Sequence, residues 1–243
     1  MPEPNLKSPP PLIAAGDGWL IVDKPAGLSV HNQPGRDACS LAAEHLGSAV
    51  PGGAPEMGFG LHAVHRLDRE TSGLLLLAFR RQVFDSLSRE FASGRVEKEY
   101  LALVHGRISP GREGAWEWLL SGSAAGRRDP QGREPRAPSV TWFRSIRSGR
   151  RYSLLSCLPR TGRTHQIRRH AALAGHPILG DRRYGSARAC RYLAEHHAFT
   201  RLALHAAALA ITLPGCASPQ RFESPGLPEA IRVLLDEDLV NTQ

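Results

Sequence analysis

Features on which several classes of protein depend are scarce in this sequence. Its four cysteines are scattered without any C-x-x-C pair, and its 11 histidines include no H-E-x-x-H motif, so neither a disulfide framework nor a resident metal is expected. The longest apolar runs are far too short to cross a membrane, and the Pro-rich start does not resemble a secretory signal. These absences favour a cytoplasmic protein that uses no metal.

Lysine is also scarce. The 31 basic residues comprise three lysines and 28 arginines, a ratio that a high-GC genome explains as well as function does. Base composition does not explain the net charge of +8, which favours a polyanionic partner. The excess is concentrated between Val140 and Arg191, where twelve arginines accompany a single acidic residue, Asp181. A segment this uneven is typical of a surface that binds phosphates.

The pattern of apolar residues predicts more strands than helices. Strands are expected within 18–30 and at 74–79, 96–106, 139–145, 151–158 and 202–213. Helices are expected at 40–46, 82–94 and 228–239. The segment 161–175 is expected to open with a turn and become a helix, with Thr164 as its N-cap and Gly175 at its end. Because the strands do not alternate regularly with helices, we predict an α+β fold with a mixed or antiparallel sheet.

The length of 243 residues allows one large domain or two small ones. The sequence contains no internal repeat and no linker of domain scale. We therefore expect a flexible Pro-rich arm at residues 1–15, followed by a single catalytic domain at residues 16–243. A monomer is the simplest oligomeric state.

Three polar residues stand out from the strands and turns around them. Asp68 precedes the apolar run of a buried strand, Tyr100 shares a strand face with Lys98, and Arg163 occupies a turn next to a glycine. Each has an ordinary structural explanation, because Asp68 could cap nearby backbone groups, Tyr100 could pack at a sheet edge and Arg163 could pair with a surface carboxylate. Residue by residue, these alternatives stay open.

Five stretches resemble, in order, motifs of the RluA-type pseudouridine synthases. The second in the chain is HRLDRETSGLLLLA, residues 65–78, which is similar to that family's H-R-L-D-x-x-T-S-G signature followed by aliphatic residues. The other four are LIVDKPAGLSVH, KEYLALVHG, PRTGRTHQIRRHAALAGHPILGDRRYG and LALHAAALAITLP. Together they cover roughly residues 18 to 214.

The resemblance implies a mixed, largely antiparallel central sheet flanked by helices and loops, with an active cleft across its middle and no cofactor. It also implies an enzyme that isomerises specific uridines of ribosomal or transfer RNA to pseudouridine. Asp68 falls on the nucleophile, Tyr100 on the residue that stacks on the target base and accepts its C5 proton, and Arg163 on the partner of the aspartate. Substrate contacts are expected from Arg66, Leu67, Thr71, Lys98, His165, Gln166, Ile167 and Arg168, and contacts to the RNA backbone from Lys24, Arg169, Arg182 and Arg183.

Two departures from the family pattern bear on substrate choice more than on activity. Arg169 stands where an aliphatic residue is common, and Ser139 stands where a small apolar one is common. Only a short segment precedes the first expected strand, so we do not expect the N-terminal S4-type RNA-binding domain that several relatives carry. Recognition is then expected from loops, chiefly 31–39, 51–60 and 106–138.

The chemistry agrees with these roles. Pseudouridine formation breaks the N1–C1′ bond, turns the uracil and joins C5 to C1′ without any redox change, so no cofactor is required. A guanidinium beside Asp68 would keep the carboxylate ionised under a bound nucleotide. Stacking on Tyr100 would offset part of the cost of flipping the base out of its stack. The sequence identifies neither the uridine nor the route, which can run through C1′, through C6 or through a glycal.

Two other functions are alternatives. One is a catalytically silent RNA-binding or RNA-folding protein on the same scaffold, against which the presence of Asp68, Tyr100 and Arg163 together speaks. The other is a nucleoside hydrolase. Such enzymes normally pair two carboxylates, and near Asp68 only Glu70 is available.

Overall fold

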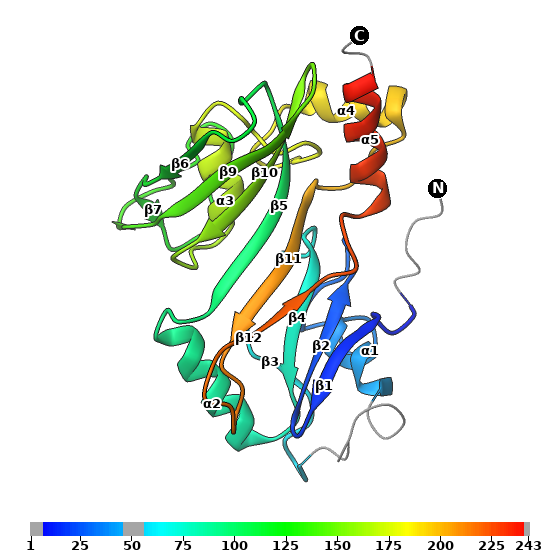
Figure 1. Cartoon of the computed structure of the whole chain (residues 1–243), viewed down its shortest axis with the longest axis vertical. Coiled ribbons are helices and arrows are strands. Elements are labelled where there is room, and N and C mark those ends of the chain that lie inside the picture. The colour runs from blue at the N-terminus through cyan, green and yellow to red at the C-terminus, as the bar shows by residue number, and fades with distance from the viewer. Residues whose placement is uncertain (1–6, 46–55, 241–243) are drawn as a thin grey trace. The chain divides into compact units, whose positions relative to one another are not determined.

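The computed structural model describes residues 7–45 and 56–240, which form two compact units (Figure 1). Unit 1 comprises Met1–Lys98 and Ala206–Gly226, and unit 2 comprises Glu99–His205 and Leu227–Gln243. Residues 1–6 of the predicted arm and residues 51–55 of the predicted loop 51–60 lie outside the described residues. The single domain at 16–243 stays a prediction.

Unit 1 is built around β4 (Ser72–Ala78), a strand that is buried along its whole length. β4 pairs antiparallel with β2 (Trp19–Lys24) and β3 (His62–Ala63), β2 pairs antiparallel with β1 (Leu12–Gly16), and β11 (Leu204–Ile211) pairs antiparallel with β12 (Gln220–Glu223). The short helix α1 (Ala38–Ala42) begins after the N-cap Asp37 and continues into a 3₁₀ turn at Ala43–His45. Helix α2 (Arg81–Ala92) packs Leu87 against Leu74 and Leu76 of β4 in one apolar cluster.

Unit 2 contains a second set of antiparallel strands. Their order is β5 (Glu97–His105), β10 (Tyr152–Pro159), β9 (Thr141–Ser148) and β6 (Glu113–Trp116), and a small hairpin is formed by β7 (Leu120–Ser121) and β8 (Arg136–Ala137). The helices are α3 (Gln166–Leu173), α4 (Ala187–His197) and α5 (Glu229–Val240), as Figure 1 shows. Residues of β5, β10, α3 and α5 share one buried apolar cluster, which forms the core of this unit.

The structure confirms the predicted α+β class and the largely antiparallel pairing. Several elements differ from the prediction. Residues 12–15, placed in the flexible arm, form most of β1 and pair with β2. Helix α4 was not predicted, and Leu193 is its only buried side chain. Segment 106–138, predicted as loops, also contains β6, β7 and β8.

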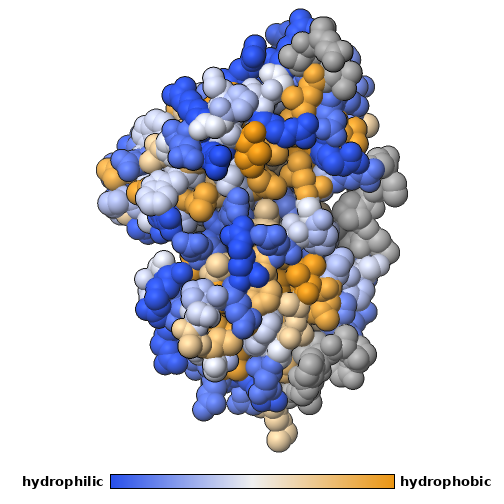
Figure 2. Space-filling model, in the orientation of Figure 1, coloured by the Kyte–Doolittle hydropathy of each residue, from blue (hydrophilic) through white to orange (hydrophobic). Residues whose placement is uncertain are grey.

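The surface seen in Figure 2 is mostly hydrophilic, with smaller apolar patches between the polar residues, as is usual for a folded chain. No helix in the described part of the chain combines the length and the apolar character needed to cross a membrane.

A buried carboxylate ties α5 to the turn between β9 and β10. Asp238 is 1% exposed and accepts the backbone N–H groups of Arg151 (2.9 Å) and Tyr152 (2.9 Å). We expect Asp238→Ala to lower the free energy of unfolding by about 2–4 kcal/mol, because it leaves the buried N–H of Tyr152 and the partly buried N–H of Arg151 unsatisfied. Urea denaturation measures this, with the more exposed Asp236→Ala in the same helix as control. Equal small losses for both variants would contradict the anchoring role.

Candidate active site

The predicted nucleophile Asp68 lies in a tight turn just before β4. The N–H of Thr71 donates to the carbonyl of Asp68 (3.1 Å) and closes the turn. The Asp68 side chain is half-buried, Leu67 and Thr71 are buried, and Arg66 is exposed. The buried hydroxyl of Thr71 has no hydrogen-bond partner within residues 7–45 and 56–240. The contacts of Arg66, Leu67 and Thr71 with substrate stay predictions. The unsatisfied hydroxyl of Thr71 supports the contact predicted for that residue.

The Asp68 turn is fastened to the segment that follows β2. Arg69 Nε donates to the carbonyl of Gly27 (2.8 Å), and the N–H of Gly27 donates back to the carbonyl of Arg69 (2.8 Å). Lys24 is fully buried, and its ammonium donates to the carbonyls of Leu28 (2.8 Å), Pro25 (3.0 Å) and Arg69 (3.1 Å). An ammonium has three donors, and here all three are used inside unit 1. The prediction that Lys24 contacts the RNA backbone therefore gains no support.

Two residues of the signature motif have structural roles that the sequence did not reveal. The ring of His65 stacks on Phe91 of α2 (4.9 Å between centroids), and its Nε2 accepts the N–H of Leu76 (3.1 Å). Burial, helped by the charge of Lys98, lowers the pKa of His65 to about 3, so the ring is neutral at pH 7 and can accept this bond. Gly73 has a φ of 112°, and a Cβ there would collide with the backbone of Ala206. The histidine and the glycine thus fix the position of β4 and of the turn before it.

Tyr100 lies in β5, in unit 2, directly across from Cys157 of β10. Cross-strand partners point to the same face, so the half-buried Tyr100 shares a face with the buried Cys157 and packs against the core cluster that includes Ile167. Lys98 belongs to unit 1, and burial lowers its pKa. The stacking role of Tyr100, and the substrate contacts of Lys98 and Ile167, stay predictions.

Arg163 is presented by a turn that Gln166 organises. The Oε1 of Gln166 accepts the N–H of Arg163 (3.1 Å) and the hydroxyl of Thr161 (2.6 Å). Its Nε2 donates to the carbonyl of Val140 (2.9 Å) and to the hydroxyl of Thr141 (2.9 Å). The amide of Gln166 is therefore engaged in holding the turn, which is a positioning role, and its contact with substrate stays a prediction. The side chain of Arg163 is exposed.

The start of α3 differs from the prediction. The N-cap is His165, with a φ of 55°, and not Thr164. The hydroxyl of Thr164 donates instead to the carbonyl of Gly122 (3.0 Å), a residue of a distant loop. His165 Nδ1 forms a hydrogen bond with the hydroxyl of Tyr184 (2.9 Å). The contact of His165 with substrate stays a prediction.

Arg168 is buried behind this turn in a two-point ion pair. Its Nε and Nη2 lie 2.8 Å and 2.9 Å from the two carboxylate oxygens of Asp181, and the two side chains are 4% and 0% exposed. Asp181 also accepts the N–H groups of Arg183 (2.9 Å) and Tyr184 (3.0 Å). Burial alone would raise the pKa of Asp181, but the hydrogen bonds and charge of Arg168 and the two N–H groups outweigh it and lower the pKa. Arg168 is thus engaged inside unit 2, and its predicted role in binding substrate gains no support.

Arg169 was also predicted to contact the RNA backbone, and the structure gives this prediction no support. The side chain is 0% exposed, and each of its guanidinium nitrogens donates to residues of unit 2. A guanidinium without exposed surface cannot reach a phosphate. Arg182 and Arg183 are exposed, as residues that bind phosphate must be, and their roles stay predictions.

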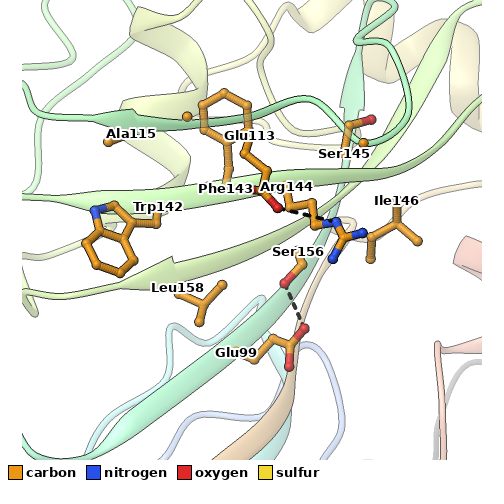
Figure 3. A pocket seen from close by; sticks show the side chains of 12 residues that line it. Glu99, Glu113, Ala115, Trp142, Phe143, Arg144, Ser145, Ile146, Ser156 and Leu158 are labelled. Carbon is orange, nitrogen blue, oxygen red and sulfur yellow. Dashed lines mark hydrogen bonds and ion pairs between the residues drawn. The ribbon is translucent and has the colours of Figure 1, made fainter.

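An open groove of about 830 Å³ lies on one face of the unit 2 sheet (Figure 3). Ser156 donates to Glu99 at its floor (2.7 Å), and Arg144 and Glu113 form an exposed ion pair (3.6 Å). Tyr100 is the cross-strand partner of Cys157, the residue after Ser156. Because side chains alternate along a strand, Ser156 and Tyr100 point to opposite faces of the sheet. None of the residues predicted to act on the substrate is among those that line the groove.

The three predicted catalytic residues do not belong to the same unit. Asp68 is in unit 1, and Tyr100 and Arg163 are in unit 2. Each contact described above joins residues of the same unit. The ion pair between Asp68 and Arg163 stays a prediction. In the described part of the chain no three His, Cys, Asp or Glu side chains are grouped as metal ligands.

The known proteins to which the chain is similar are RNA pseudouridine synthases. The family model for RNA pseudouridylate synthase matches residues 18–173. Ribosomal large subunit pseudouridine synthase C of Vibrio vulnificus is 36% identical over 216 residues, which are 88% of this chain and 65% of that protein. The protein of the same name from Escherichia coli K12 is 39% identical over 211 residues, 86% of this chain and 64% of that protein. The chain therefore spans 64–65% of the length of these relatives.

Solved structures show the same fold. Human RNA Pseudouridylate Synthase Domain Containing 1 superposes with a TM-score of 0.73 at 24% identity, over 93% of this chain and 86% of that chain. Human RNA Pseudouridylate Synthase Domain Containing 4 superposes with a TM-score of 0.68 at 24% identity, over 91% and 90%. These similarities confirm the fold class that the sequence motifs implied.

Proposed function

The chain belongs to the RNA pseudouridylate synthase family, and from that membership we propose that it converts uridines of structured RNA to pseudouridine. The observation that carries the proposal is the HRLDRETSG turn, in which a half-buried Asp68 is set before the buried strand β4 by the hydrogen bonds of Lys24, Arg69 and His65. A carboxylate that only caps a surface loop has no need of this framework.

The proposed roles follow the steps of the reaction. Asp68 is the nucleophile, and Arg163 is the guanidinium that keeps it ionised beneath a bound nucleotide. Tyr100 stacks on the flipped uracil and takes the C5 proton. The N1–C1′ bond breaks, the C5–C1′ bond forms, C5 loses its proton and N1 gains one, so the reaction balances without a cofactor. The exposure of Arg163 and the half-buried ring of Tyr100 support these roles.

The proposed substrate is RNA of the large ribosomal subunit, because the relatives described above are ribosomal large subunit pseudouridine synthases. Transfer RNA is the second candidate. The net charge of +8 supports a polyanionic partner of either kind. We propose further that the protein acts as a monomer in the cytoplasm.

Tritium release from RNA labelled at C5 of uridine tests the activity. The wild-type protein is expected to release tritium from large-subunit ribosomal RNA transcribed in vitro and to leave pseudouridine in the product. RNA binding without release would favour the silent RNA-binding protein, and free uracil as product would favour the hydrolase.

A further inference from the structure

The loop of residues 122–136, which connects β7 to β8, has an ordered conformation of its own. Its ends are joined by the hairpin, in which Ser121 lies opposite Arg136, and the N–H of Ser121 donates to the carbonyl of Gln131 (2.9 Å). Within the loop, the N–H of Gly132 donates to the carbonyl of Asp129 (3.1 Å) and the N–H of Asp129 donates to the carbonyl of Gly126 (3.2 Å). The 122–136 loop is therefore folded back on itself by backbone hydrogen bonds.

The buried guanidinium of Arg169 holds the 122–136 loop and the hairpin from inside. Its hydrogen bonds reach five main-chain carbonyls and one hydroxyl: Pro130 O (2.6 Å), Ser121 O (3.0 Å), Ser123 O (3.3 Å), Thr164 O (3.1 Å), Gln131 O (2.5 Å) and Ser121 Oγ (2.9 Å). The planar fork of an arginine carries five N–H donors, whereas an ammonium carries three and an aliphatic side chain carries none.

Gly132 is part of the same arrangement. It is buried with a φ of 73°, and a Cβ at this position would overlap Ser121 Oγ and come within 3.1 Å of Arg169 Nη2. Only glycine therefore lets the loop close over the guanidinium.

Two contacts of Thr164 join the 122–136 loop, directly and through Arg169, to the turn that carries Arg163. The hydroxyl of Thr164 donates to the carbonyl of Gly122 (3.0 Å), and Arg169 Nη1 donates to the carbonyl of Thr164 (3.1 Å). On the other side, Ala125 donates its N–H to the hydroxyl of Tyr184 (3.2 Å) and accepts from Arg183 Nε (2.6 Å). The loop is thus fixed to both ends of the Arg163–Tyr184 segment.

The outer side of the 122–136 loop presents positive charge. Arg127, Arg128 and Arg133 are exposed, and none of them forms an ion pair with a residue in the described ranges. The loop's two acids, Asp129 and Glu134, are both close to the fourth arginine, Arg136, at 3.7 Å and 3.6 Å. The acids therefore offset the charge of Arg136 and leave three guanidinium groups for a partner.

We propose that the 122–136 loop is a preformed arm that binds the RNA phosphate backbone, and that Arg169 is the positioning residue that locks this arm to the Arg163 turn. The inference rests on the proposed function and adds to it a surface that holds the RNA while Arg163 acts. A loop that is ordered before binding loses little entropy on association, and arginine contacts to phosphates position RNA without reading its sequence.

The first test measures the salt dependence of RNA binding. Affinity for large-subunit ribosomal RNA transcribed in vitro is measured between 50 and 200 mM salt for the wild type and for R127Q/R128Q/R133Q. Three lost phosphate contacts lower the slope of log affinity against log salt by about 2 to 2.7. The wild-type affinity then falls roughly 20- to 40-fold more than that of the variant over this range.

The matched control is R89Q/R221Q/R232Q, which removes the same charge at exposed arginines outside the arm. The proposal would be overturned if the slope of the control variant falls as much as that of the arm variant. It would also be overturned if the arm variant keeps the wild-type slope, and the loop would then be reassigned to a partner other than RNA.

The second test changes the buried support without removing any exposed charge. R169M is expected to lower the salt slope and raise KM for RNA about tenfold, while kcat at saturating RNA stays within a few fold. R169K is not expected to rescue it, because one ammonium cannot replace the fork. G132A disturbs the same hydrogen bonds from the loop side. It is also expected to lower the salt slope and raise KM for RNA while kcat stays within a few fold. A fall in kcat without a change of KM or slope in both variants would overturn the positioning role of Arg169.

Binding and turnover are read separately, so the two proposals can fail separately. If the wild type makes no pseudouridine but the slopes change as expected, the arm stands and the proposed function falls. If the wild type is active and the slopes of all arm variants equal the wild-type slope, the arm falls alone.

Discussion

Asp68→Asn is expected to abolish pseudouridine formation, with a loss of at least about 10⁴-fold in turnover, while the affinity for RNA stays within a few fold of wild type. Asparagine has the size of aspartate and preserves the turn, whose hydrogen bond uses the main-chain carbonyl of residue 68. It lacks the negative charge needed to attack a carbon atom. Tritium release from C5-labelled RNA measures the turnover, and equilibrium binding to the same RNA measures the affinity.

Two variants make this result specific. Asp85→Asn removes the same charge from an exposed position on α2, in the same unit, and is expected to keep full activity. Glu70→Gln tests the other carboxylate near Asp68 and is expected to keep most of it. If Asp68→Asn loses binding as severely as turnover, the residue supports the fold or the RNA and is not the nucleophile. If Glu70→Gln is equally inactive, a pair of carboxylates must be considered.

The sequence predicted best where side-chain pattern and local geometry coincide. The all-apolar run after Thr71 predicted a buried strand, and β4 is buried throughout. Alternation predicted β5, and glycine at the end of the pattern predicted where α3 stops, since Gly175 has a φ of 79°. These features depend on residues close together in the chain. The family motifs then predicted the fold class, which the solved structures confirm.

The sequence did not predict which polar side chains are used by partners far along the chain. Lys24 and Arg169 were predicted to contact the RNA backbone, yet their donors are used by carbonyls up to 45 and 48 residues away. Thr164 failed as a helix cap for the same reason, because its hydroxyl is used by Gly122, 42 residues away. A buried lysine or arginine satisfied by loop carbonyls has no periodic signal. The departure of Arg169 from the family pattern was the one available sign that its role is unusual.

The largest effect on stability is expected at Asp181. Asp181→Asn breaks a buried ion pair by removing one partner, and this usually costs about 3–5 kcal/mol because the other charge stays buried without compensation. Arg168 is that charge, at 4% exposed. Asp181 also accepts the N–H of Tyr184, whose hydroxyl binds His165 at the start of α3, so the damage should extend to the Arg163 turn. Urea denaturation at pH 7 measures the loss.

The same variant should change how stability depends on pH. The pKa of Asp181 is lower in the folded protein than its ordinary value of 3.8. Its contribution is therefore present in full above pH 3.8 and is lost as the pH falls through the folded pKa. His65, His170 and His205 have pKa values lowered by burial, to about 3, 4 and 4, and they make the wild type lose stability below pH 6.5 as well. Both proteins keep these histidines, so the difference in unfolding free energy between wild type and Asp181→Asn isolates the ion pair.

That difference is expected to be constant from pH 7 to about pH 5 and to shrink below pH 3.8, where the carboxylate of the wild type begins to protonate in the unfolded chain. Asp236→Asn is the matched control, because Asp236 pairs with Arg147 and Arg232 at a side-chain exposure of 41% and should cost no more than about 1 kcal/mol. Similar losses for Asp181→Asn and Asp236→Asn would mean that the Arg168–Asp181 pair adds no more than a surface ion pair. The start of α3 would then have to be held by the amide of Gln166 and by the contacts of Thr164 and His165.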